Sequence, residues 1–256
     1  MLKQLAPLLL PLPIVIVALL LSDRPPDCDL PLQADDSVVS VPPDFIKLPA
    51  GRERKQGFVD YLLPIIHEHN QQLRNHRQAV QCLHKGRKTL LSEQRRWLQK
   101  MAQRYRVTEE LEGDGFWREM LNKINEIPPS LALAQGANES AWGTSRFARE
   151  GNNLFGLWCF KPGCGVVPLH RPEGATYEVA SFDSVTDSVR EYMRTLNSHP
   201  GYDELRELRS EQGQLSGEEL AQGLGEYSAR GKAYIEELQQ MIRYNRWQEY
   251  DKPAGE

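Results

Sequence analysis

This sequence lacks an excess of positive charge, and that absence limits the partners it can be expected to bind. Its 31 Lys and Arg residues are outnumbered by 35 Asp and Glu residues, which leaves a formal net charge of −4. Proteins that bind nucleic acid usually carry a basic face or stripe. We therefore expect no nucleic-acid partner. The 256 residues suffice for one medium domain with extensions.

The motifs of several common enzyme classes are absent as well. The sequence has no G-x-S-x-G elbow, no G-x-x-x-x-G-K-[ST] phosphate loop, no G-x-G-x-x-G motif after a strand and no H-E-x-x-H motif. His67 and His69 are two residues apart on a predicted helix, so their side chains point to different faces. We therefore expect no cofactor and no metal. Internal repeats and coiled-coil heptads are also absent.

The N-terminal residues 1–22 differ in composition from the rest of the chain. Lys3 precedes an apolar, uncharged run at residues 5–21, which is typical of a signal peptide or a short membrane anchor. Prolines in this run disfavour a long membrane-spanning helix, yet no cleavage site is obvious, so cleavage stays open. Residues 23–55 are rich in proline and predict a linker. We expect a cell-envelope protein that is periplasmic, secreted or anchored to the inner membrane through residues 5–21.

Cysteine is scarce, with four residues in the chain. In an exported protein, Cys159 and Cys164 can close a small disulfide loop around the turn-forming sequence F-K-P-G. A zinc site would need two more ligands, and His170 alone leaves the set short. We expect Cys82 to be a small buried apolar residue on a helix and Cys28 to be an unpaired residue of the linker.

The spacing of apolar residues predicts a mainly α-helical domain at residues 56–248, followed by a tail at residues 249–256. Mostly apolar positions three or four apart mark one face of a long helix from residue 58 to about Gly86, with Pro64 in its first turns. Short β-prone runs with glycines at residues 158–181 predict a small β-hairpin lobe. Further helices are expected at residues 92–105, 115–125, 130–140, 183–197, 201–209, 216–227 and 232–247.

One acidic residue, Glu139, ends an alanine-rich apolar helix, and Gln135 lies one turn earlier on the same face. A carboxyl group beside apolar surface has a raised pKa and can stay protonated near neutral pH, as a general acid must. Aromatic and amide side chains, which suit a sugar ring with an acetamido group, surround Glu139 in the sequence. The side chains expected around the sugar are Gln135, Trp142, Asn152, Asn153, Phe155 and Trp158.

The stretch at residues 134–156 resembles the core motif of the bacterial glucosaminidase domain, family 73 of the glycoside hydrolases. The family pattern A-Q-x-x-x-E-S-x-W-G is matched at residues 134–143, and S-R-F-A and N-N-L-F-G follow it. The segments GFVDYLLPII and YSARGKAYIEELQQMI resemble the Bax-type subgroup. The resemblance covers about residues 56–245. It implies a lysozyme-like α domain with a small β lobe, in which Glu139 is the catalytic glutamate.

The resemblance also implies a second catalytic group, whose identity stays open. A second carboxylate on the β lobe is proposed in the family as base or stabiliser, and Glu173 and Glu178 are the candidates here. If neither takes part, the 2-acetamido oxygen of the substrate can serve as nucleophile. Tyr227 matches a tyrosine near the catalytic site of related glucosaminidases. Its hydroxyl can orient the acetamido group or a water, and a core tyrosine is the alternative.

The aromatic residues near Glu139 have two interpretations each, core residue or sugar platform. Trp158 is favoured as a platform because it enters the variable β lobe, whereas Trp142 is left undecided. Phe155, beside a turn glycine, is favoured as a structural residue.

Together these features predict a peptidoglycan hydrolase, an endo-β-N-acetylglucosaminidase that cuts β-1,4 bonds after N-acetylglucosamine with Glu139 as proton donor. Its expected partner is the glycan strand of peptidoglycan. A lytic transglycosylase or muramidase is one alternative, because lysozyme-like folds also place a Glu-Ser pair at a helix end. A non-catalytic glycan-binding envelope protein is the other, because the second carboxylate is uncertain.

Overall fold

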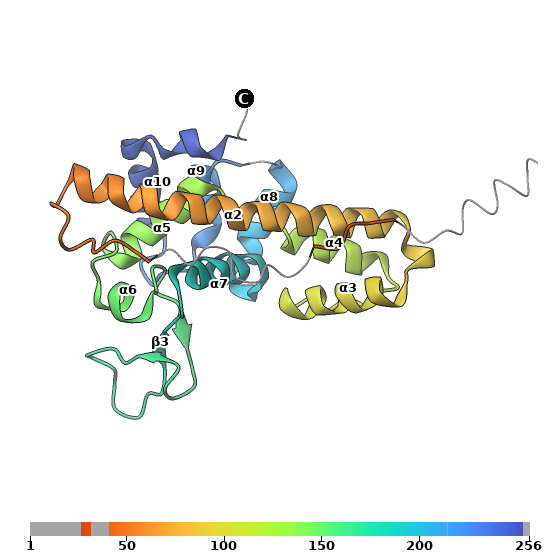
Figure 1. Cartoon of the computed structure of the whole chain (residues 1–256), viewed down its shortest axis with the longest axis horizontal. Helices are drawn as coiled ribbons and strands as arrows, with labels where there is room; N and C mark the ends of the chain where they lie inside the picture. The colour runs from red at the N-terminus through yellow and green to blue at the C-terminus, as the bar shows by residue number, and fades with distance from the viewer. Residues whose placement is uncertain (1–26, 32–40, 214, 253–256) are drawn as a thin grey trace, which may run out of the picture.

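The computed structural model describes residues 27–31, 41–213 and 215–252 of the chain (Figure 1). The predicted signal or anchor segment at residues 1–22 lies outside these described residues. Among the helices that are described, none combines the length and the apolar character needed to cross a membrane.

The fold is mainly α-helical with one small sheet, as the sequence predicts. The α-helices are α2 (Arg52–Lys85), α3 (Ser92–Arg104), α4 (Asp114–Lys123), α5 (Pro129–Ser140), α6 (Arg146–Gly151), α7 (Val185–Ser198), α8 (Asp203–Gln212), α9 (Gly217–Leu220) and α10 (Lys232–Asn245). Short 3-10 helices are η1 (Arg87–Thr89), η2 (Pro200–Tyr202), η3 (Ala221–Leu224) and η4 (Trp247–Asp251).

Helix α2 runs along the length of the helical body (Figure 1). Its 34 residues correspond to about 51 Å at 1.5 Å per residue. The buried face runs from Phe58 to Leu83, in agreement with the predicted periodicity. The prediction that Pro64 lies in the first turns is wrong, because the helix already begins at Arg52. The first turn of α2 is polar and contributes no residue to the buried face, so the spacing of apolar residues could not predict where the helix begins.

Helix α5 lies at the centre of the helical body. It is buried on all sides from Pro129 to Ala137, as expected for a helix whose apolar residues surround its axis. It packs against α2, α9, α10 and η4. The predicted tail begins inside η4, where Asp251 accepts hydrogen bonds from the backbone N–H groups of Ser130 and Gly217, each at 2.8 Å. This carboxylate therefore caps the N-terminal ends of α5 and α9.

The predicted β lobe projects from the helical body below α6 (Figure 1). It contains the strands β1 (Trp158–Cys159), β2 (Gly165–Val166) and β3 (Glu178–Ala180). Strand β3 lies in the middle and is antiparallel to both neighbours. The lobe is thus a three-stranded sheet rather than a single hairpin.

Cys28 and Cys82 form a disulfide, so the expectations of an unpaired Cys28 and of a Cys82 that serves only as a small buried apolar residue are both wrong. The two residues are 54 positions apart, and only the folding of the N-terminal segment onto α2 brings them together. The described parts of the predicted linker pack on the helical body. Phe45, which is 4% exposed, contacts the ring of Phe58 at 5.6 Å between centroids.

Candidate active site

The last turn of α5 fixes the direction of the Glu139 side chain. Ser140 Oγ donates to the carbonyl of Gly136 (2.6 Å) and accepts from the N–H of Gly143 (2.7 Å), so it joins the helix to the following turn. Residues 141–143 have positive φ angles of 49°, 60° and 77°, which end the helix abruptly. Glu139 is therefore held at the exit of a buried helix.

Glu139 is half-buried, and its carboxyl group has hydrogen-bond donors as neighbours. The Tyr234 hydroxyl and the Asn138 amide both donate to it, the latter over 3.4 Å. Burial raises the pKa of Glu139 above its ordinary value, while these hydrogen bonds and the Arg230 guanidinium partly oppose the rise. Arg230 itself is paired with Glu237. Among the described residues, none forms an ion pair with Glu139, so its carboxyl group can retain a proton to a higher pH than an exposed glutamate.

A chain of buried hydrogen bonds leads to this carboxyl group. The Tyr192 hydroxyl donates to the side-chain oxygen of Gln135 over 2.7 Å, and the Gln135 amide donates to the Tyr234 hydroxyl over 3.0 Å. The Tyr234 oxygen is therefore an acceptor towards Gln135, and its proton is available for Glu139. Burial raises the pKa of both tyrosines, which keeps them protonated as donors.

Tyr227 lies beside Tyr234 with its ring nearly parallel, at 5.6 Å between centroids. Its hydroxyl donates to the carbonyl of Phe155 over 2.8 Å. Phe155 is 1% exposed and stacks on Tyr192 at 4.0 Å, a position that fits a structural role. Tyr227 therefore connects the segment before α10 to the loop that faces Glu139.

The loop after α6 places Gly156 next to Glu139. A Cβ atom at Gly156 would lie 3.5 Å from Glu139 Oε2, and its φ of +65° also favours glycine. Asn153 is 1% exposed, donates to the carbonyls of Leu157 and Ala180, and accepts from two backbone N–H groups of the same loop. These four bonds use the whole Asn153 amide, so it shapes the loop instead of offering a free group to a sugar.

Trp142, which the sequence leaves undecided between core residue and sugar platform, is half-buried against the helical body. Its ring contacts Phe58 and Trp247, each at 5.7 Å between centroids, and Lys55 Nζ lies 4.9 Å from the ring centre. These neighbours come from α2 and η4, whereas the neighbours of Glu139 come from α10 and the loop after α6. The structure does not bring Trp142 into the cluster around Glu139.

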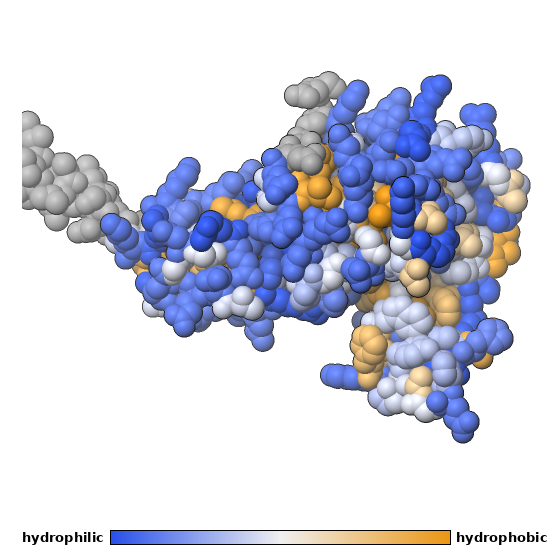
Figure 2. Space-filling model, turned by 180° about the vertical axis from the view of Figure 1, so that it is seen from behind, coloured by the Kyte–Doolittle hydropathy of each residue, from blue (hydrophilic) through white to orange (hydrophobic). Residues whose placement is uncertain are grey.

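Trp158, the residue favoured as a platform, is 53% exposed on the β lobe and packs edge-on against Tyr177 at 4.9 Å between ring centroids. Phe160 and Leu169 are more exposed still, at 74% and 81%. Figure 2 shows hydrophobic residues on this projecting lobe, while most of the visible helical surface is hydrophilic. The lobe thus offers an apolar surface, and the sequence motif did not identify Phe160 or Leu169 as part of it.

The two candidate second carboxylates differ in their surroundings. Glu178 is 5% exposed and accepts hydrogen bonds from the N–H groups of Gly163 (3.0 Å) and Gly165 (2.8 Å). These bonds lower the pKa of Glu178, and Arg171 lies 3.9 Å from its carboxylate. Glu173 is exposed in the loop between β2 and β3. Glu178 therefore organises the lobe, whereas Glu173 has an exposed side chain on the same lobe.

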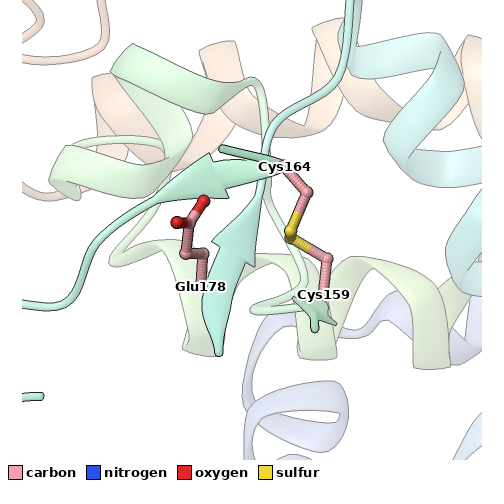
Figure 3. A group of neighbouring side chains, drawn as sticks. All are labelled: Cys159, Cys164 and Glu178. Carbon is pink, nitrogen blue, oxygen red and sulfur yellow. A yellow bond between two sulfur atoms is a disulfide. The ribbon is translucent and has the colours of Figure 1, made fainter. Parts of the chain in front are cut away.

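Cys159 and Cys164 form the expected disulfide, which lies beside Glu178 (Figure 3). Their sulfur atoms and a Glu178 oxygen are within 4.8 Å of one another, a grouping that could resemble a metal site. Both sulfurs are bonded to each other, so neither is available as a thiolate ligand. The disulfide and the carboxylate together tie β1, β2 and β3 into one unit.

The structure places Gln135, Glu139 and Tyr227 in one cluster with Tyr192 and Tyr234. Gln135 is separated by 57 residues from Tyr192 and by 99 residues from Tyr234. Both partners of Gln135 come from distant parts of the chain, so no local pattern indicated that Tyr192 and Tyr234 would contact it.

The central helix ends at a half-buried glutamate that has a raised pKa and no ion pair among the described residues, and this combination defines a candidate glycosidase site. Residues 117–246 match the family described as Mannosyl-glycoprotein endo-beta-N-acetylglucosaminidase. The chain is also similar to Protein bax of Escherichia coli (strain K12), with 32% identity over 213 residues that cover 79% of this chain and 74% of that protein. No solved structure gives a significant match.

The chain therefore belongs to the glucosaminidase family and has a Bax-type glucosaminidase domain. Membership of this family implies glycoside hydrolase chemistry and a glycan substrate.

Proposed function

We propose that this protein is a peptidoglycan hydrolase, an endo-β-N-acetylglucosaminidase that cleaves β-1,4 bonds after N-acetylglucosamine, with Glu139 as general acid. The observation that carries the proposal is the half-buried Glu139 carboxyl group, which has a raised pKa, a tyrosine donor and no ion pair among the described residues. The two disulfides fit an oxidising compartment such as the periplasm or the cell exterior.

Glycosidic cleavage requires a proton on the leaving oxygen and a group that captures or stabilises the positive charge on the sugar. Protonated Glu139 can supply the first. Gly156 supports this role because it leaves space directly beside the carboxyl group. Trp158 supports sugar binding, since an exposed ring face can stack on a pyranose.

For the second group we favour Glu173 over Glu178. Two backbone hydrogen bonds stabilise the Glu178 carboxylate inside the lobe and oppose its use as a base, whereas Glu173 is exposed on a loop of the same lobe. If Glu173→Gln retains full activity, the 2-acetamido oxygen of the substrate becomes the favoured nucleophile. Because the Tyr227 hydroxyl donates its proton to the Phe155 carbonyl, it would then orient the acetamido group only by accepting from its N–H.

The first prediction concerns Glu139→Gln, assayed in a zymogram with purified sacculi and in a sacculus pull-down. We expect the hydrolysis of sacculi, seen as clearing of the gel, to fall by at least about 100-fold, in keeping with the contribution of a general acid. Binding to sacculi should persist. A Glu150→Gln variant, which changes an exposed glutamate on α6, is the matched control and should clear normally. Clearing by the Glu139→Gln variant at the wild-type rate would contradict the assignment of the acid.

Mass spectrometry of the soluble products identifies the bond that is cut. Reducing N-acetylglucosamine ends support the proposal. Anhydro-muramic ends would instead indicate a lytic transglycosylase, and reducing muramic ends a muramidase. Binding without clearing by the wild-type protein would indicate a non-catalytic glycan-binding protein.

A further inference from the structure

A cavity lies at the other end of the central helix from the Glu139 cluster. It has a volume of about 950 Å³ and is bounded by residues of α2, α4, α8 and η4. Pro128 and Pro129, at the N-terminal end of α5, also line it. Glu139 lies near the other end of the same helix, about 15 Å away at 1.5 Å per residue.

The side chains that line this cavity carry an excess of positive charge. Five are Arg or Lys and two are Asp or Glu, and both carboxylates already have partners. Glu126 is paired with Arg74. Asp251 caps α5 and α9 through backbone N–H groups. The remaining basic residues are Arg77, Arg118, Arg209 and Lys252, and no described carboxylate forms an ion pair with any of these four.

Arg209 is the most informative of these residues because it is 6% exposed and still lacks an acidic partner among the described residues. Its guanidinium donates to the carbonyls of Asn122 and Glu126 and to the side chain of Asn197, but its Nε has no partner in the described part of the chain. Burial lowers the pKa of Arg209 to about 9, and the nearby charge of Arg206 adds to this. Carbonyl dipoles offset only part of a formal charge.

Burial of the Arg209 charge costs free energy. An anion in the cavity would reduce this cost, because a buried charge is stabilised by an opposite charge nearby. The volume of the cavity exceeds that of a single inorganic ion and suits a short peptide. The peptide stems of peptidoglycan carry several carboxylates. A stem of four or five extended residues spans about 13 to 17 Å at 3.3 to 3.4 Å per residue. This length is comparable with the distance of about 15 Å between Pro129 and Glu139 along α5.

We propose that this cavity binds the carboxylate-bearing stem peptide of the glycan substrate, while Glu139 acts at the sugar. This inference rests on the proposed function, since it assigns a part of the same substrate to a second site. The exposed cations Arg118 and Lys252 attract the carboxylates at the cavity rim, and Arg209 supplies positive charge beneath it.

The test measures the affinity of a fluorescently labelled stem tripeptide, L-Ala-γ-D-Glu-diaminopimelate, by anisotropy at low salt. We expect saturable binding that weakens at least tenfold in the double variant Arg118→Glu, Lys252→Glu. Arg96→Glu, Lys100→Glu makes the same charge change at exposed positions of α3 away from the cavity and should stay within twofold of wild type. Thermal melting of each variant shows whether it is folded.

Three results would overturn the inference. They are an absence of saturable binding, equal losses in the two double variants, and equal affinity for a tripeptide whose carboxylates are converted to amides. Binding of tetraglutamate as tight as that of the stem tripeptide would also overturn it, in favour of an acidic segment of another protein.

The peptide assay is repeated with Glu139→Gln so that binding is separated from catalysis. Failure of the tripeptide to bind, together with normal clearing of sacculi by the wild type, would contradict this inference and leave the hydrolase proposal intact. Tripeptide binding without any clearing by the wild type would contradict only the hydrolase proposal.

Discussion

The carboxyl group of Glu139 experiences two opposing influences. Burial disfavours its charged form, and the Tyr234 hydroxyl, the Asn138 amide and the Arg230 charge favour it. Burial is the larger influence, so the pKa of Glu139 is raised. A general acid must donate its proton during bond cleavage and recover it afterwards. The Tyr234 hydroxyl stabilises the carboxylate that is left after donation, which assists the first of these steps.

Tyr234→Phe should raise the pKa of Glu139 further, because it removes a donor that stabilises the charged form. Since the acid acts when protonated, activity falls as the pH rises through this pKa, and in the variant that fall should move to higher pH. The maximal rate should decrease by about tenfold, as one positioning hydrogen bond is lost. Hydrolysis of sacculi measured from pH 4 to 9 reports both effects.

Tyr192→Phe is the matched control for this substitution. It removes a buried hydroxyl that donates to the Gln135 oxygen and not to the Glu139 carboxyl group. We expect it to destabilise the fold by about 1 to 3 kcal/mol while leaving the pH profile in place. A shift of the alkaline limb to lower pH in Tyr234→Phe, or equal shifts in both variants, would contradict the role assigned to Tyr234.

At the scale of single elements, the turn that follows α5 is the feature that presents Glu139. Three residues in succession have positive φ, and Gly143 packs directly against the ring of Phe45. A Cβ atom at Gly143 would lie 2.3 Å from Phe45 Cδ2. The turn after α5 therefore packs against Phe45, which lies nearly 100 residues earlier in the chain.

Gly143→Ala should destabilise the protein by about 2 to 5 kcal/mol, through left-handed backbone strain and through overpacking against Phe45. Gly174→Ala is the control that measures the backbone strain without overpacking. Gly174 also has a positive φ (81°), but no atom lies within 4 Å of the added carbon. It should cost about 1 to 2 kcal/mol. Denaturant unfolding compares the two, and equal losses would show that the contact with Phe45 has no effect.

At the scale of the whole molecule, two disulfides act on different parts of the chain. The Cys28–Cys82 bond fixes the N-terminal segment to α2 and closes a loop with a sequence separation of 54. The Cys159–Cys164 bond has a separation of 5 and lies within the β lobe. The first therefore constrains the unfolded chain much more than the second, while the second shapes a surface close to the proposed sugar site.

Replacing both Cys28 and Cys82 by Ser should cost about 4 kcal/mol of stability, against about 2 kcal/mol for Cys159 and Cys164, by the loop-entropy relation. We expect the opposite order for substrate affinity, with the larger rise in KM after loss of the lobe disulfide. Thermal melting and kinetics on soluble glycan chains give the two quantities. A larger stability loss from the lobe pair would contradict this division of roles.

Much of the helical framework could be predicted from the sequence because burial of one helix face leaves a periodic pattern. The core face of α2 from Phe58 to Leu83 and the fully apolar α5 are examples. The start of α2 at Arg52 could not be predicted, since its first turn has no buried face. The small lobe was located by its glycines, but the central place of β3 depends on pairing between distant strands.

The candidate site was predictable only in part for a similar reason. Glu139 and Gln135 lie one turn apart on one helix, so their common face follows from helix geometry. Asn153 lies in the same motif, yet its amide is used entirely by hydrogen bonds to its own loop and to β3, which composition could not reveal. Trp142 likewise packs on Phe58 and Trp247 instead of joining the cluster.

The sequence by itself determined the helical class, the position of Glu139 at the end of a buried helix and the lobe disulfide, because each depends on residues close together in the chain. The tertiary structure alone decided the Tyr192–Gln135–Tyr234 hydrogen bonds, the Cys28–Cys82 bond and the basic cavity at the other end of α5. These features join distant segments, and their energies depend on the burial and proximity that only packing of the whole chain creates.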